Sequence, residues 1–318
     1  MLLWPCIALA AGLILLVWSS DKFVAGAAAI AHNLGMSHIL IGVTIVSMGT
    51  SAPEILVSTN AALDNALNLS LGNALGSNIA NIGLVLGITA LIAPIPVSAR
   101  VMKIENLIVL LVSLATGFIF YDSFLSRGEG VVLLAGLVIF LLWVFYDHKK
   151  SQDDDFEDEI PTGMNTGKAV MWFVIGLGVL ILSSKILVWG ATQIAISLKI
   201  SELVIGATVV AIGTSLPELA ASVASARKGH HDIAIGNVLG SNLFNLLAVI
   251  GVPAILAPNA FAADVFWRDY LVMIFMTAFL SISLIIKGSS GKPLGRIFAL
   301  MALIAYGGYL FLNYRALT

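Results

Sequence analysis

Two polar motifs occur twice each in an otherwise apolar chain, and their side chains are of the kind that binds hard cations. The first motif, Gly-Thr-Ser-x-Pro-Glu, covers 49–54 and 213–218, and the second covers 72–81 and 236–245. Together they supply carboxylates, hydroxyls and amides but no His or Cys. Such oxygen-only sets favour Ca²⁺, Mg²⁺, Mn²⁺ or Na⁺ over Zn²⁺ and Cu. One Ca²⁺ neutralises two carboxylates, and several Na⁺ ions can share the same oxygens, so exchange of one cation for another is the chemistry that the set allows.

The spacing of the first motif directs its oxygens to one place. Thr50, Ser51 and Glu54 stand at i, i+1 and i+4 of a helix and therefore share a face. The proline has no N–H for the carbonyl four residues before it and distorts the preceding turn. We therefore expect free carbonyl oxygens around 47–49 and around 211–213. The second copy places the same side chains at Thr214, Ser215 and Glu218.

The second motif adds neutral oxygens from the following helix. In each copy a serine and an asparagine lie one helical turn apart and are expected to offer their oxygens to the same point; these residues are Ser77, Asn81, Ser241 and Asn245. Glycines in the motif allow neighbouring backbones to approach closely.

The composition places these motifs inside a membrane. Of the 318 residues, 59% are apolar and 11% are charged, against about 25% charged in ordinary soluble domains. This balance excludes an ordinary cytosolic enzyme, and the net charge of −2 gives no indication of nucleic-acid binding. Glu54 and Glu218 fall halfway along apolar spans, where a charge costs on the order of 2.5–3.5 kcal/mol. With no basic residue near either in sequence, a cation is the expected partner.

Apolar runs predict an all-α polytopic membrane protein with ten transmembrane helices. The first is interpreted as a retained span, because no basic residue precedes its apolar run. The acidic stretch 148–167 is expected to be a cytoplasmic linker, which separates a first five-helix repeat, 1–147, from a second, 168–318. The expected spans are 2–31, 36–62, 70–93, 104–121, 130–147, 168–196, 200–226, 232–257, 268–286 and 294–314.

The two halves are related by duplication. With an offset of 164 residues, 36–94 aligns with 200–258 without a gap, and 24 of 59 positions are identical. The identities include Pro, Glu, Asn and Gly, which shared hydrophobicity does not explain. Because each half has an odd number of spans, equivalent helices cross the membrane in opposite directions. Such inverted repeats are typical of secondary transporters with a substrate site near the midplane.

Basic residues predict the orientation. With both termini outside, the inner loops hold ten Lys or Arg residues, the outer side holds four and two lie within spans, which accounts for all 16. The linker is then cytoplasmic.

At these motifs the sequence resembles the cation/calcium antiporter superfamily, and most closely its prokaryotic sodium/calcium exchanger branch. The resemblance covers essentially the whole chain. It implies alternating access in which Na⁺ entry drives Ca²⁺ out across a prokaryotic cytoplasmic membrane, with long first and sixth helices that slide during transport. It also implies that the motif residues named above bind the ions, with Glu54 and Glu218 as central ligands and the carbonyls of Ser47 and Ala211 as backbone ligands.

One departure from the family pattern limits what the resemblance implies. Some members carry Asp at a position matching Asn81 or Asn245, whereas both are Asn here. The expected site therefore has only two carboxylates, which argues against a potassium-dependent variant.

Several alternatives stay open at this point. A Ca²⁺ or other divalent cation/H⁺ exchanger would use the same carboxylates with protons in place of Na⁺. A passive cation channel and a non-transporting membrane scaffold are less consistent with an inverted repeat. The expected partners are Ca²⁺, Na⁺ and the lipid bilayer. No resident cofactor, nucleic acid or obligate protein partner is expected, nor is enzymatic activity.

Overall fold

The first half of the chain is built of five helical segments, some broken by π-helical turns. The computed structural model describes residues 2–150, 163–198 and 211–317. In order, the elements are α1 (Leu3–Leu34); α2 (His38–Ile41), η1 (Gly42–Val46), α3 (Ser47–Thr50) and α4 (Ala52–Leu63); α5 (Leu67–Ala80), η2 (Asn81–Leu86) and α6 (Gly87–Ile92); η3 (Val101–Glu105) and α7 (Asn106–Phe120); β1 (Phe124–Leu125); and α8 (Arg127–Lys150).

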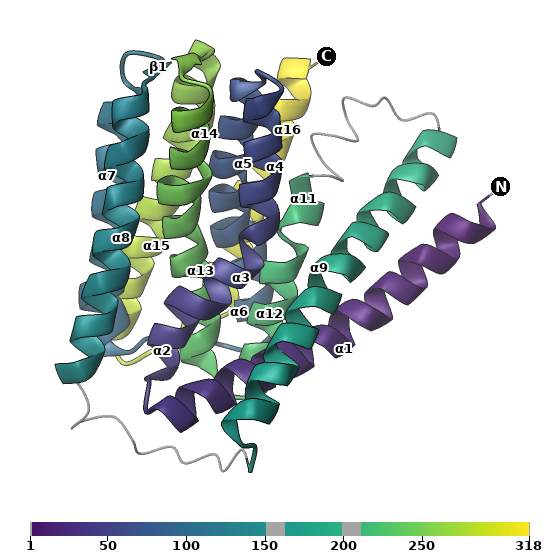
Figure 1. The fold of residues 1–318 in the computed structure, drawn as a ribbon, viewed down its shortest axis with the longest axis vertical. Coiled ribbons are helices and arrows are strands. Elements are labelled where there is room, and N and C mark those ends of the chain that lie inside the picture. The colour runs from purple at the N-terminus through teal and green to yellow at the C-terminus, as the bar shows by residue number, and fades with distance from the viewer. Residues whose placement is uncertain (1, 151–162, 199–210, 318) are drawn as a thin grey trace.

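The described helices of the second half follow the same order, but its strand comes before the fourth helical segment and not after it. Its elements are α9 (Thr166–Ser197); α11 (Ala211–Thr214) and α12 (Leu216–Arg227); α13 (His231–Phe244), η5 (Asn245–Val249) and α14 (Gly251–Leu256); β2 (Asn259–Ala260); η6 (Val265–Tyr270) and α15 (Leu271–Ser289); and α16 (Arg296–Leu317). The short strands β1 and β2 pair antiparallel and join the two halves at one end of the molecule (Figure 1).

The predicted helical class is confirmed. The described parts of nine expected spans begin and end within three residues of the predicted bounds. Within the described ranges, eight helices are long and apolar enough to cross a membrane, and one bent pair, His38–Thr50 with Ala52–Leu63, makes a ninth candidate. The seventh expected span, 200–226, lies partly outside the described residues, so the count of ten stays a prediction.

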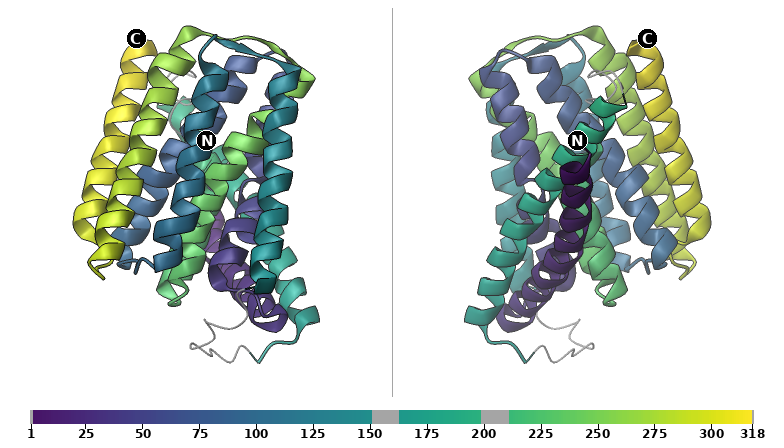
Figure 2. Two further views of the ribbon diagram at one scale, coloured as in Figure 1. Left: turned by 90° about the vertical axis from the view of Figure 1, so that its left-hand side faces the viewer. Right: turned by 90° about the vertical axis from the view of Figure 1, so that its right-hand side faces the viewer.

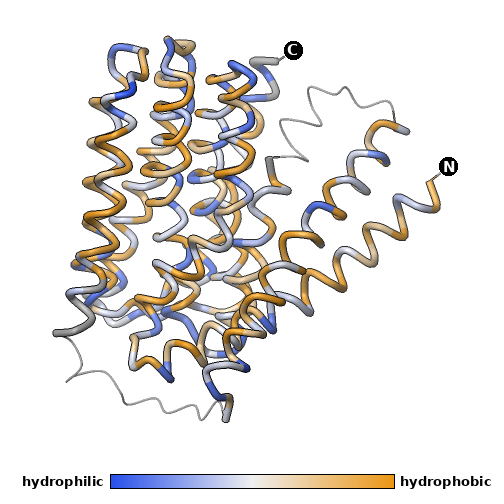
Figure 3. The backbone as a smooth tube through the Cα atoms, in the orientation of Figure 1, coloured by the Kyte–Doolittle hydropathy of each residue, from blue (hydrophilic) through white to orange (hydrophobic). Residues whose placement is uncertain are grey.

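Burial separates the centre of the molecule from its rim. The spans Leu67–Ile92 and His231–Leu256 have 72% and 89% of their most apolar stretch buried, whereas the six other continuous spans have 22–33%. Outer side chains such as Phe118, Phe275 and Ile304 are exposed, and the long helices are hydrophobic over most of their length (Figure 3). Exposed apolar surface of this extent marks a membrane-facing protein. The second polar motif therefore lies on the two central helices.

Helices α1 and α9 tilt away from the rest of the bundle, and they cross each other with their chains running in opposite directions (Figures 1 and 2). Glycines bring their backbones together: a Cβ at Gly26 would lie 2.6 Å from the Phe173 nitrogen, and one at Gly176 would lie 2.5 Å from the Phe23 nitrogen. The offset of 164 relates Gly12 to Gly176 and Gly26 to Gly190, and all four glycines face the opposite helix. The crossing is therefore close to symmetric.

Substituting Gly176 by Ala is expected to force α1 and α9 apart, because the new methyl group would meet backbone atoms that cannot turn away. Overpacking of this kind costs about 1–3 kcal/mol, so we expect a lower Tm of the detergent-solubilised protein by tryptophan fluorescence. Gly178, two residues along α9, has no atom within 4 Å of an added Cβ and provides the matched control. An equal Tm for Gly176→Ala and Gly178→Ala would contradict the close packing.

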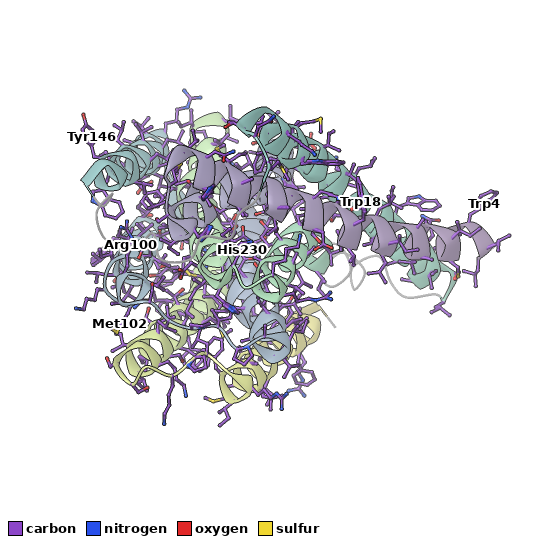
Figure 4. The ribbon with its side chains drawn as sticks, turned by 90° about the horizontal axis from the view of Figure 1, so that it is seen from below. Trp4, Trp18, Arg100, Met102, Tyr146 and His230 are labelled. Carbon is purple, nitrogen blue, oxygen red and sulfur yellow. The ribbon has the colours of Figure 1, made fainter. Side chains whose placement is uncertain are left out.

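A histidine cluster lies at the end of the molecule opposite the chain termini. His230, in the loop between α12 and α13, packs its ring against His38 with 5.2 Å between ring centroids, and it lies near the centre of this end (Figure 4). Burial lowers the pKa of His230 from 6.5 to about 4, and the nearby charges of His38, Lys228 and His231 add to the shift. Lys228 also pairs with Asp21 of α1 at 3.2 Å.

The lowered pKa of His230 predicts acid sensitivity. Between pH 6.5 and about 4, the unfolded chain binds a proton that the folded chain excludes. The contribution of this histidine to stability is therefore complete above pH 6.5 and is lost as the pH falls. We expect Tm to fall over that range and His230→Gln to reduce the fall, whereas His32→Gln, at an exposed position, leaves it unchanged. If His230→Gln and wild type showed the same pH slope, the prediction would be wrong.

Candidate functional site

Each first motif forms a break between two helices. Ser51 ends α3 and begins α4 with φ −82° and ψ 0°, and Pro53 stands in the first turn that follows. The two parts of this span are bent by 44°. In the second half, Ser215 occupies the same place before α12 with φ −85° and ψ 3°. A proline is tolerated in a first helical turn because no N–H is needed there, so the motif restarts the helix just before its glutamate.

The glutamates are buried where these breaks meet the central helices. Glu54 and Glu218 each stand in the first turn of the restarted helix and are 1% exposed. The hydroxyl of Ser51 donates to Oε1 of Glu218 at 3.3 Å, so it crosses from the first repeat to the second. Figure 1 shows α3 meeting α13 about halfway between the two ends of the molecule. The structure thus brings the two acidic residues into one central region.

Several oxygens in this region have no hydrogen-bond partner among the described residues. They are Oε1 and Oε2 of Glu54, Oε2 of Glu218, Oγ of Ser215, and Oδ1 of Asn81 and of Asn245. Unpaired buried polar atoms are costly, and a carboxylate with nothing to compensate its charge is more so. The described ion pairs all lie elsewhere, at Arg100, Lys228 and Arg268. The six atoms named here are all oxygens and fit a hard cation.

Thr50 and Ser241 join the same region from opposite repeats. The Thr50 hydroxyl lies 3.1 Å from Oδ1 of Asn237 and 3.5 Å from the Ser241 hydroxyl. The hydroxyls predicted from the two motifs are therefore brought together by the contact between α3 and α13.

Three further predicted ligands lie on α5 and α11. Ser77 is buried on α5, and Thr214, at the end of α11, is partly buried. Ala211 begins α11. Within the described ranges no group of three His, Cys, Asp or Glu side chains is close enough to hold a metal ion, so any site here is two carboxylates completed by neutral oxygens.

The expectation of a free carbonyl at Ser47 is wrong for this structure. The Ser51 N–H donates to the Ser47 carbonyl at 2.9 Å, and the Thr50 hydroxyl lies 3.3 Å from it. The physical reason is that Pro53 removes only its own N–H, and the N–H of Ser51, two residues earlier, still reaches back. In the second repeat, the Ser215 N–H donates to Ile212 instead. Among the described contacts, the N–H at the break thus bonds to the carbonyl four residues back in the first repeat and three residues back in the second.

Two asparagines not named as ligands brace the glutamate backbones. The Asn73 amide donates to the carbonyl of Glu54 at 3.2 Å and to the hydroxyl of Ser58 at 2.9 Å. Its counterpart makes the same pair of bonds: Asn237 donates to Glu218 at 3.3 Å and to Ser222 at 3.0 Å. Each brace ties the restarted helix to the central helix of its own repeat. The identity of Asn, Glu and Ser in register was the sequence signal for these contacts.

The repeats differ in how the long helices contact the breaks. Ser184 of α9 donates to the carbonyl of Gly213 at 2.7 Å. The equivalent Ser20 of α1 donates within its own helix, to Val17 at 2.9 Å. The structure therefore ties α9 to the break of its repeat through a bond that Ser20 does not make.

The fold is that of a multi-pass helical membrane protein with unpaired polar oxygens buried at its centre. The family model described as sodium/calcium exchanger protein matches residues 4–146 and 168–315. The chain belongs to the sodium/calcium exchanger family, and it is a cation/Ca²⁺ antiporter by class.

Similar proteins cover nearly the same length. The chain is 44% identical over 306 residues to the CaxA protein of Alkalimonas amylolytica, covering 95% of this chain and 96% of that one. It is 38% identical over 273 residues to inner membrane protein YrbG of Escherichia coli (strain K12), covering 84% of each. A solved structure of the sodium-calcium exchanger NCX_Mj, soaked with Na⁺ and Ca²⁺, matches with a TM-score of 0.82 and 35% identity over 96% of this chain and 97% of that one.

Proposed function

We propose that the protein exchanges Na⁺ for Ca²⁺ across the membrane at one central site. The observation that carries the proposal is the set of six buried oxygens without a described partner, which come from both repeats and include both glutamates. In this proposal Glu54 and Glu218 are the central ligands. The remaining ligands come from both motifs: Thr50, Ser51, Thr214, Ser215, Ser77, Asn81, Ser241 and Asn245, with the carbonyls of Ser47 and Ala211.

The chemistry of the set supports competition between the two ions. Ca²⁺ takes six to eight oxygen ligands in flexible geometry, and its charge balances the two carboxylates. The same carboxylates, with neutral oxygens around them, suit Na⁺ ions that together supply a similar charge. A site that either cargo fills, but not both at once, couples their fluxes. The Ser47 carbonyl has two lone pairs, so it can act as a ligand while it keeps the Ser51 N–H bond, provided that the Thr50 hydroxyl turns away from it.

Two features support alternating access: the two repeats make nearly equivalent contacts, and they differ in one hydrogen bond. The first and second repeats, proposed at 1–147 and 168–318 around the linker 148–167, make equivalent contacts at the α1–α9 crossing. They differ at Ser20 and Ser184, of which only the second contacts its break. Because the inverted halves are nearly equivalent, the first repeat can adopt the contact that the second now makes, while the second loses it. This swap gives a second state, open to the other side of the membrane.

The orientation proposed is both termini outside a prokaryotic cytoplasmic membrane. The start of α1 and the end of α16 lie in the upper half of Figure 1, and the end of α8 and the start of α9 lie at the opposite end. The ten Lys and Arg residues of the expected inner loops belong to the linker end, and basic residues favour the cytoplasmic side. The printed name of YrbG, an inner membrane protein, is consistent with this placement.

Counter-flow in sealed proteoliposomes tests the coupling. Vesicles loaded with Na⁺ are diluted into Na⁺-free medium, and uptake of radioactive Ca²⁺ is followed with pH and voltage clamped. We expect uptake only when Na⁺ is inside. Uptake that follows an imposed pH gradient without Na⁺ would replace the proposal with Ca²⁺/H⁺ exchange on the same carboxylates. Ca²⁺ flux that neither gradient drives would indicate a passive channel.

A further inference from the structure

Four asparagines link the central helices of the two repeats. Asn78 and Asn81 lie one turn apart at the α5–η2 junction, and Asn242 and Asn245 lie in the same places at the α13–η5 junction. All four are 1% exposed. The amide of Asn245 donates to Oδ1 of Asn78 at 3.0 Å, and the amide of Asn81 donates to Oδ1 of Asn242 at 3.1 Å. Asn81 and Asn245, which are both proposed ligands, are thus each held by an asparagine of the opposite repeat.

The direction of the bond between Asn78 and Asn245 is fixed by a backbone group. The Asn78 nitrogen donates to the backbone carbonyl of Asn242 at 3.3 Å, and a carbonyl can only accept. The oxygen of Asn78 must therefore face Asn245, which in turn must present its nitrogen. The remaining atom of the Asn245 amide is its oxygen, which is buried and has no partner among the described residues.

The second pair lacks this backbone anchor. Oδ1 of Asn81 is also buried without a described partner, but the nitrogen of Asn242 has none either. The orientation of Asn81 therefore depends on one hydrogen bond, whereas that of Asn245 depends on a chain of two.

We propose that Asn78 and Asn242 are positioning residues that turn the oxygens, and not the nitrogens, of Asn245 and Asn81 toward the transported cation. This rests on the proposed function, in which Asn81 and Asn245 are ligands. An amide group carries an acceptor oxygen and a donor nitrogen of similar size. A flipped amide would remove one ligand oxygen and direct N–H groups at a positive ion. Holding the nitrogen against the opposite repeat prevents that flip.

The test uses the symmetry of a carboxylate. In Asn78→Ala the Asn245 amide is free to rotate, so we expect the apparent affinity for Ca²⁺ to fall about tenfold, which corresponds to about 1.4 kcal/mol. In an Asn245→Asp background both side-chain oxygens accept, and orientation no longer matters. There, Asn78→Ala is expected to change affinity less than about threefold, or about 0.65 kcal/mol. Affinity is measured by equilibrium binding of radioactive Ca²⁺ to the purified protein without Na⁺.

A control and a second pair make the result decisive. Thr89→Val removes a buried hydroxyl that bonds within the same span, to Val85 at 2.7 Å, and should leave Ca²⁺ affinity unchanged. If Asn78→Ala does not fold, Asn242→Ala with and without Asn81→Asp tests the same idea from the other repeat.

The outcomes distinguish this inference from the proposed function. An equal loss of affinity on adding Asn78→Ala to the wild-type protein and to the Asn245→Asp variant would indicate a purely structural role and overturn the inference. Unchanged affinity in Asn78→Ala, alongside lost binding in Glu218→Gln, would also overturn the inference while the proposed site stood. Absence of Ca²⁺ binding by folded wild-type protein would overturn both.

Discussion

Glu54→Gln and Glu218→Gln each lower Na⁺-driven Ca²⁺ uptake by at least about 100-fold in the expected result. Each change keeps the side-chain volume but removes one of the two charges that balance Ca²⁺ in the proposed site. A 100-fold loss corresponds to about 2.8 kcal/mol, which is modest for a buried carboxylate facing a divalent ion. Both changes should act alike, because both side chains are 1% exposed and retain unpaired oxygens. Uptake into Na⁺-loaded proteoliposomes measures the effect.

Glu105→Gln is the matched control for these variants. Glu105 is also buried, at 2% exposure, but it pairs with Arg100 at 2.8 Å at the start of the fourth span and has no described contact with the site. We expect a lower Tm from loss of this pair and an unchanged apparent KM for Ca²⁺. Uptake retained in Glu54→Gln or Glu218→Gln, at normal protein stability, would remove these residues from the site.

Asn237→Leu should have the next largest effect, reducing Ca²⁺ uptake about tenfold through a higher KM. The change removes the bonds from Asn237 to the Glu218 carbonyl and the Ser222 hydroxyl, and its contact with Thr50 of the other repeat. Each such hydrogen bond contributes about 0.5–1.5 kcal/mol. The loss loosens the backbone that carries Glu218 and frees a proposed ligand hydroxyl. Initial rates of uptake across a range of Ca²⁺ concentrations separate KM from the maximal rate.

The control for Asn237→Leu is a buried polar group that does not cross between repeats. Thr116 on α7 is fully buried and bonds within its helix to Val112 at 2.9 Å. Thr116→Val is expected to leave KM unchanged. If Asn237→Leu lowered only the maximal rate, or changed nothing, its brace would not position Glu218 for ion binding.

Sequence alone predicted the features that repeat in register. The offset of 164 residues identified the paired motifs, the proline predicted a helix break, and the apolar runs located the spans. These predictions follow from local patterns: a proline acts within its own turn, and a span is a continuous apolar run. The structure places Ser51 beside Glu218 and Thr50 beside Ser241, which no local pattern encodes.

Contacts between the repeats and details of the backbone could not be predicted from the sequence. Helical periodicity places Asn78 and Asn242 on a different face from the proposed ligands, which by itself favours a structural role. The structure shows that this face meets the opposite repeat, where both asparagines hold proposed ligands. The π-helical turns that begin at Asn81 and Asn245 had no signal in the residue pattern. The bonded carbonyl of Ser47 depends on the local path of the backbone at the break.

The bonds between the central helices make the two halves of the molecule depend on each other. Asn81 donates to Asn242, and Asn245 donates to Asn78, so each half provides a hydrogen-bond acceptor for an asparagine of the other half. The glycine contacts of the two long helices are reciprocal in the same way. Two identical five-helix chains, inserted in opposite directions, could make all of these contacts as a homodimer. The two halves depend on each other in the same way, because a change at an asparagine of one half removes a hydrogen-bond partner from the other half.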